Sequence, residues 1–141
     1  GTYLPILQAL ILDGKTVCLN ISGSSMAPFL IHQRDSVRLQ RPEHPPISGD
    51  IVLYQRENGQ FILHRICRIK NGFYSLAGDN QTVLDGPVPP KQIFAIVTAV
   101  CRKGQWLKAE DPRWQFFAIF WRRMLHLRPI FLFIYTKLSK Y

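Results

Sequence analysis

The sequence is short of acidic residues. It holds nine Asp and Glu against 18 Lys and Arg, which gives a formal net charge of +9. The imbalance is largest after Cys101, where nine Lys and Arg are accompanied by two acids, Glu110 and Asp111. A basic surface attracts nucleic acid or anionic lipid, and composition alone does not choose between them.

Cysteine is also scarce. The three cysteines, Cys18, Cys67 and Cys101, lie far apart and show no CxxC or Cys/His ligand spacing. An odd, scattered set argues against a disulfide framework and against a structural zinc site. We therefore expect buried thiols. Separately, no metal ion or cofactor is expected.

Long uninterrupted apolar runs are missing. The first residues, GTYLPILQALILDGK, are too short an apolar stretch to span a bilayer and lack the basic and cleavage regions of a secretory signal. Near the other end, Arg122, Arg123 and Arg128 interrupt the apolar run. We expect no signal peptide and no transmembrane helix, with a location in the cytoplasm or peripheral at the membrane.

The regular pattern that is present predicts a mainly β fold. Leu4, Leu7 and Leu10 recur at helical spacing and predict a helix over 3–13 that stops at Gly14. From Lys15 the apolar period changes to two, which indicates a strand. Further strands are expected over residues 35–40, 50–55, 60–70, 73–77 and 93–102. Short strands with turns rather than helices between them are typical of an antiparallel β domain.

We expect three parts: a helix over 1–14, a β domain over 15–110 and a basic, aromatic helical tail over 111–141. Asp111 and Pro112 offer an N-cap and a first helical residue, and Pro129 is expected to break the helix. One interpretation of the tail is an interfacial helix that contacts a membrane peripherally, with the apolar residues Trp114, Phe117 and Trp121 in lipid. The alternative is that this face packs on the β domain.

Four residues suggest chemistry. In ISGSSMAPFL, Ser25 is presented on a tight turn just before Met-x-Pro, and a serine hydroxyl needs a base to become a nucleophile. His64 lies in the middle of an expected strand and could be that base, while Asp79 or Asp85 could orient its ring. Each residue alone also has a structural interpretation, as a turn serine, a packed histidine or an Asx-turn aspartate.

Together, these segments resemble the type I signal peptidases and the LexA-type self-cleaving repressors, which share a β-rich catalytic fold. The resemblance covers roughly residues 15–101. Its marks are four blocks in order, SSMAPFL, SGDIVLY, LHRI and GDNQTVLDG. The pair His64-Arg65 is similar to the endoplasmic-reticulum and archaeal branch, which uses a Ser–His site.

The resemblance implies residue roles. Ser25 would be the nucleophile, His64 the base and Asp85 the partner of His64, ahead of Asp79, which would organise its turn. Signal peptidases carry a serine two residues before the nucleophile, where this chain has Gly23, so backbone N–H groups or Ser24 would have to stabilise the oxyanion.

The implied function is a serine endopeptidase that acts on a peptide or protein substrate. A first alternative is a catalytically inactive peptide-binding module on the same fold. A nucleic-acid-binding domain is a second alternative. We do not expect it, because the basic charge clusters with Trp and Phe in the tail rather than alternating with aromatics on a sheet.

Overall fold

The structure, a computed structural model, describes residues 4–139. The helices and strands are, in chain order, α1 (Leu4–Leu12), β1 (Val17–Asn20), β2 (Ser36–Gln40), β3 (Ile51–Gln55), β4 (Phe61–Lys70), β5 (Phe73–Ala77), β6 (Asp85–Val88), the 3-10 turn η1 (Pro90–Gln92), β7 (Ile93–Arg102), β8 (Gln105–Leu107), α2 (Pro112–Gln115), the π-helical η2 (Phe116–Trp121), the 3-10 turn η3 (Leu125–Leu127) and α3 (Arg128–Ser139).

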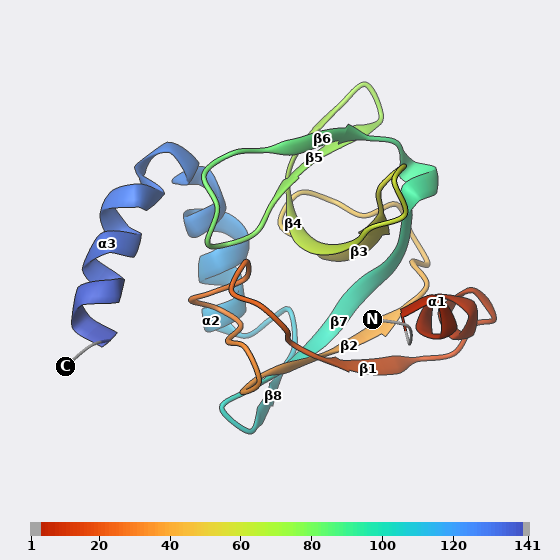
Figure 1. Cartoon of the computed structure of the whole chain (residues 1–141), viewed down its shortest axis with the longest axis horizontal. Helices are drawn as coiled ribbons and strands as arrows, with labels where there is room; N and C mark the ends of the chain where they lie inside the picture. The colour runs from red at the N-terminus through yellow and green to blue at the C-terminus, as the bar shows by residue number, and fades with distance from the viewer. Residues whose placement is uncertain (1–3, 140–141) are drawn as a thin grey trace.

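The strands form one antiparallel sheet, which confirms the predicted fold class. Its order is β1-β2-β7-β3-β4-β5-β6, with β8 paired to β7. The long strand β7 crosses the molecule between the two halves of the sheet, while α1 lies at one end and α3 at the other (Figure 1).

The core has two clusters that meet at β3. Ile51 and Leu53 belong to the first, together with residues of β2, β7 and α1. Val52 and Tyr54 belong to the second, with residues of β4, β5 and β6. Because successive strand residues point to opposite faces, β3 is buried on both sides, and its neighbour β4 is held at the centre of the fold.

The sequence located six of the eight strands and missed β6 and β8. The segment of β6, DGPV, contains Gly and Pro, the two strongest turn-forming residues, so its local pattern is that of a turn rather than a strand. Proline is tolerated in β6 because this strand lies at the edge of the sheet. Of the expected helix 3–13, residue 3 lies outside the described residues, as do residues 140–141 of the tail.

The expectation of buried thiols is wrong. Cys18 is exposed, and Cys67 and Cys101 are half-buried.

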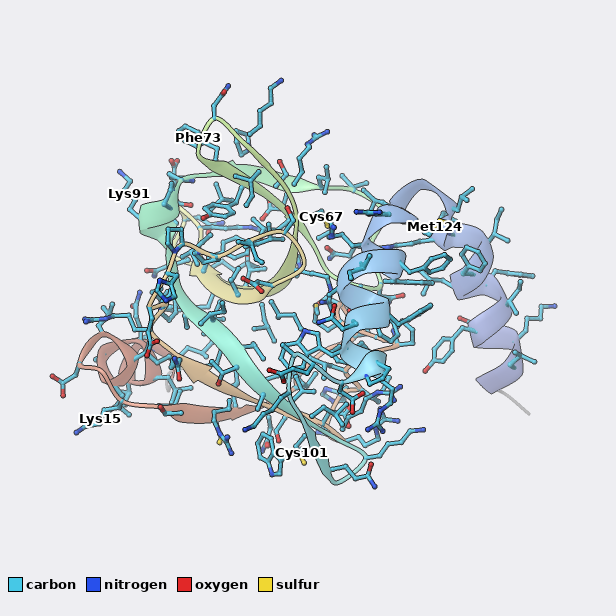
Figure 2. All side chains as sticks on the ribbon, turned by 180° about the vertical axis from the view of Figure 1, so that it is seen from behind. Lys15, Cys67, Phe73, Lys91, Cys101 and Met124 are labelled. Carbon is cyan, nitrogen blue, oxygen red and sulfur yellow. The ribbon has the colours of Figure 1, made fainter. Side chains whose placement is uncertain are left out.

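The start of the tail is as predicted. Asp111 is the N-cap of α2, its carboxylate accepting a 2.8 Å bond from the Arg113 N–H, and Pro112 follows as the first helical residue. The prediction that Pro129 breaks the helix is wrong. The first helical run ends before Met124, which marks the reversal of the chain in Figure 2, and Pro129 lies in the first turn of α3. A first turn tolerates proline because its N–H has no partner inside the helix.

The prediction that Trp114, Phe117 and Trp121 enter lipid is also wrong. All three are buried in the first core cluster, and the Phe117 ring packs on Phe29 in a tilted arrangement, with 4.8 Å between the ring centroids. The alternative, that this face packs on the β domain, is correct. Within residues 4–139, no helix has the length and apolar character needed to cross a membrane.

Candidate active site

The loop that follows β1 presents Ser25. Gly23 turns the chain at φ +87°, a backbone region that favours glycine, and its N–H donates a 2.8 Å bond to Nδ1 of His32. Met26 and Phe29 are buried and anchor the loop in the core. Ser25 itself remains half-buried, so its side chain is accessible from the pocket beside it.

A second loop supports Ser25 from behind. The Asn80 N–H donates a 2.8 Å bond to the Ser25 carbonyl. At Gly78, an added Cβ would stand 2.2 Å from that same carbonyl oxygen, well inside van der Waals contact. Position 78 therefore requires glycine because the two loops approach each other so closely.

His64 reaches the same pocket from β4. It pairs with Val52 of β3 and is only 4% exposed. Ser25 and His64 both line a cavity of about 350 Å³, whose apolar walls include Leu19 and Phe61. Within the described residues no hydrogen bond joins the Ser25 hydroxyl to the imidazole; such bonds are often long in structures without substrate.

Tyr54 connects His64 to Asp85. Its hydroxyl donates to a carboxylate oxygen of Asp85 at 2.5 Å and lies 3.4 Å from Nδ1 of His64. Arg56 also binds that oxygen, at 3.1 Å from both Nε and one terminal nitrogen. The Asp85 carboxylate thus acts on the imidazole through a phenol rather than by direct contact.

Tyr54 is not among the site residues predicted from the sequence. On β3 it stands opposite Ile62, which places it diagonal to His64 on the same face of the sheet. A signal for it lies in the turn-forming segment ENGQ (57–60) between the two strands, since a hairpin that pairs across this turn brings residues 54 and 64 to one face. No local pattern indicated the contact with Asp85, 31 positions further along the chain.

Burial and neighbouring charges set the protonation states of His64, Asp85 and Tyr54. Burial lowers the pKa of His64 to about 4; the negative charge of Asp85 opposes this shift, and the positive charge of Arg56 adds to it. Burial would raise the pKa of Asp85, but hydrogen bonds from Tyr54 and Arg56 outweigh it and hold that pKa below its usual value. Burial, reinforced by Asp85, raises the pKa of Tyr54. At neutral pH the imidazole and the phenol are therefore uncharged and Asp85 is ionised.

This charge state favours one imidazole tautomer. The Tyr54 hydroxyl has one hydrogen to donate, and it donates it in the hydrogen bond to Asp85. The phenol oxygen is therefore left to accept a hydrogen bond from Nδ1–H of His64. The lone pair of the ring is then on Nε2. A neutral imidazole with Nε2 unprotonated can remove a proton from a hydroxyl.

Asp79 occupies a different environment. It is fully buried, and its two oxygens each accept a 2.9 Å bond from the guanidinium of Arg65. Its carbonyl accepts a 2.8 Å bond from the Trp121 indole. Ser24 is exposed on the loop, and the residues that line the cavity include Ser22 and Gly23 but not Ser24.

A model of the Peptidase S24-like family matches residues 1–101, which include Ser25, His64 and Asp85. The family has a peptidase-type fold and also includes non-catalytic members. The match supports membership of this chain in the superfamily of LexA-like and signal-peptidase-like proteins. A search of curated proteins finds no significant match to the chain. On the strength of the family match, this chain belongs to the Peptidase S24-like family.

Proposed function

We propose that the chain is a serine endopeptidase of the signal-peptidase type, in which Ser25 is the nucleophile and His64 the general base. The observation that carries the proposal is that Ser25 and a neutral, buried His64 line one cavity. Family membership supports a serine peptidase-like hydrolase, and the pair His64-Arg65 favours the Ser–His branch.

In the proposed reaction, the Ser25 oxygen attacks the scissile carbonyl while Nε2 of His64 takes its proton. The imidazolium then returns that proton to the leaving amine, and water hydrolyses the acyl-enzyme by the reverse sequence. Tyr54 and Asp85 hold the ring in the required tautomer and stabilise its charged form. Among the described residues the Ser25 N–H donates no hydrogen bond, so it is available for the oxyanion. Ser24 is the second candidate donor and would have to turn toward the cavity, because it is not among the residues that line it.

The substrate would bind as an extended peptide. β1 is an edge strand, and its residues Leu19 and Asn20 border the cavity. On the other side, residues 61–64 of β4 also border the cavity, and the pairing of β4 with β5 starts only at Arg65. These two open backbone edges suit β-augmentation by a peptide. The resemblance implies small side chains at the cleavage site.

The test is cleavage of a mixed peptide library, followed by mass spectrometry. We expect Ser25→Ala and His64→Ala each to abolish cleavage and Ser24→Ala to retain part of it. Cleavage by Ser25→Ala at the wild-type rate would refute the assignment.

The second candidate is a catalytically inactive peptide-binding module. It is favoured by the absence of a Ser25–His64 hydrogen bond in the described structure and by the non-catalytic members of the family. It predicts library peptides that bind without turnover and a His64→Ala variant that binds as well as the wild type.

A further inference from the structure

The helices of the tail expose a second apolar face, opposite to the buried one. In η2 the buried residues are Phe117 and Trp121, while Phe116, Ile119 and Phe120 point outward at helical spacing. Phe116 and Phe120 stack on each other at 5.3 Å between ring centroids. Aromatic side chains thus cover both sides of this helix.

In α3 the apolar exposure is larger still. Arg128 is buried and Leu132 packs against the core, but most of the helix projects away from the sheet (Figures 1 and 2). Phe133 is 62% exposed and Leu138 is 70% exposed. We call the exposed apolar residues of η2 and α3 the outer helical face: Phe116, Ile119, Phe120, Ile130, Phe133, Ile134 and Leu138. Large apolar side chains exposed in such number are typical of an interaction site.

The charged residues on the helices that carry the outer helical face are all basic. No acidic residue follows Asp111 in the sequence. Arg123 and Lys137 are exposed, and within residues 4–139 neither takes part in an ion pair. The Lys137 ammonium lies 5.1 Å from the centre of the Phe133 ring, so positive charge and apolar surface are adjacent.

We propose that the outer helical face docks on an anionic lipid bilayer, with the apolar side chains in the interface and Arg123 and Lys137 at the headgroups. Apolar and aromatic side chains combined with basic residues are the composition of interfacial helices. A second copy of the chain fits less well, because a two-fold interface would bring the same basic residues together without an acid to pair them.

The docking helices are attached to the loop that supports Ser25. Arg128 donates to the carbonyls of Gly78 at 3.1 Å and Gln81 at 2.9 Å, and the Trp121 indole donates to Asp79. The surface is therefore presented by the folded domain itself. Docking does not depend on peptidase activity, so it can be tested in a Ser25→Ala background, where failure of one proposal leaves the other intact.

The test is co-sedimentation of the full chain with two kinds of vesicle. One kind is phosphatidylcholine alone, and the other also contains about 30% phosphatidylglycerol, an anionic fraction that gives a strong surface potential. We expect binding to the mixed vesicles and a loss of at least about tenfold in affinity for Phe133→Ser/Ile134→Ser. The matched control is Val83→Ser, which removes an apolar side chain that is 76% exposed elsewhere on the molecule and should leave binding unchanged.

Charge is tested by Arg123→Gln/Lys137→Gln, which should weaken binding to the mixed vesicles and reduce its dependence on salt. The proposal is overturned if the wild type binds neither kind of vesicle, or if Phe133→Ser/Ile134→Ser binds like the wild type. It is also overturned if size-exclusion chromatography with light scattering shows a wild-type dimer and a monomeric Phe133→Ser/Ile134→Ser variant, since the outer helical face would then bind a second copy of the chain.

Discussion

Tyr54 and Asp85 are joined by a 2.5 Å hydrogen bond, which places the carboxylate one side chain away from the imidazole of His64. The phenol oxygen lies 3.4 Å from Nδ1 of that ring. A carboxylate in direct contact would itself accept the hydrogen bond from Nδ1–H, whereas here that bond is accepted by the oxygen of a neutral phenol that donates to Asp85. This arrangement makes Tyr54 a positioning residue in the proposed mechanism.

Tyr54→Phe tests that role. The variant keeps the buried ring but removes the acceptor for Nδ1–H, so we expect kcat/KM to fall by about ten- to a hundredfold, with KM nearly unchanged; a positioned base contributes about 10²–10⁴ in all. The control is Tyr74→Phe, which deletes a hydroxyl bonded to the Pro46 carbonyl at 3.1 Å. Unchanged kinetics in Tyr54→Phe would remove Tyr54 from the mechanism.

Burial of His64 makes stability depend on pH. Its pKa is about 4 in the folded protein, against about 6.5 in the unfolded chain. Between these values the unfolded state binds more protons, so the free energy of unfolding decreases as pH falls from about 6.5 to about 4. The loss is about 3 kcal/mol.

Urea unfolding at several pH values measures this effect. His64→Asn should flatten the pH dependence inside that window, and His44→Asn, at an exposed histidine, should not change it. Equal pH dependence in wild type and His64→Asn would contradict the burial of a neutral imidazole.

The ion pair of Arg65 and Asp79 is fully buried and bidentate, so removing one charge leaves the other without compensation. We expect Asp79→Asn to lower the free energy of unfolding by about 3–5 kcal/mol. Asp111→Asn is the control, because Arg113 and Asp111 form an exposed pair and Asn remains a good N-cap. Its cost should be much smaller, because water screens a surface ion pair. Similar losses in the two variants, measured by urea unfolding, would contradict this account.

Gly78→Ala tests the support of Ser25. The new methyl would stand 2.2 Å from the Ser25 carbonyl, so one of the two loops must move. Because a shift of about 1 Å can cost about a hundredfold in rate, we expect at least that loss in kcat/KM. Gly59→Ala has open space around the new methyl and should retain activity despite its positive φ. Wild-type kcat/KM in Gly78→Ala would show that the contact is not needed.

Local pattern predicted most of the sheet because β2, β5 and β7 alternate or bury apolar residues between clear turns. It could not orient the tail, since the segment WQFFAIFW is aromatic around the whole helix and its periodicity does not separate a buried face from an exposed one. The four sequence blocks, in their order along the chain, predicted that Ser25 and His64 act together, and both residues line one cavity. The position of Tyr54 beside His64 depends on the register of β3 and β4. Its hydrogen bond to Asp85 depends on a contact with β6 that no local pattern shows.

The central claim is that Ser25 forms an acyl-enzyme. The most direct measurement is rapid acid quench of the full chain with an N-acetylalanyl p-nitrophenyl ester, followed by intact-mass analysis and mapping of the modified peptide. We expect one acetylalanyl adduct on Ser25, present in Ser24→Ala, absent in Ser25→Ala and strongly slowed in His64→Ala. An adduct on another residue, or an equal adduct in Ser25→Ala, would contradict it.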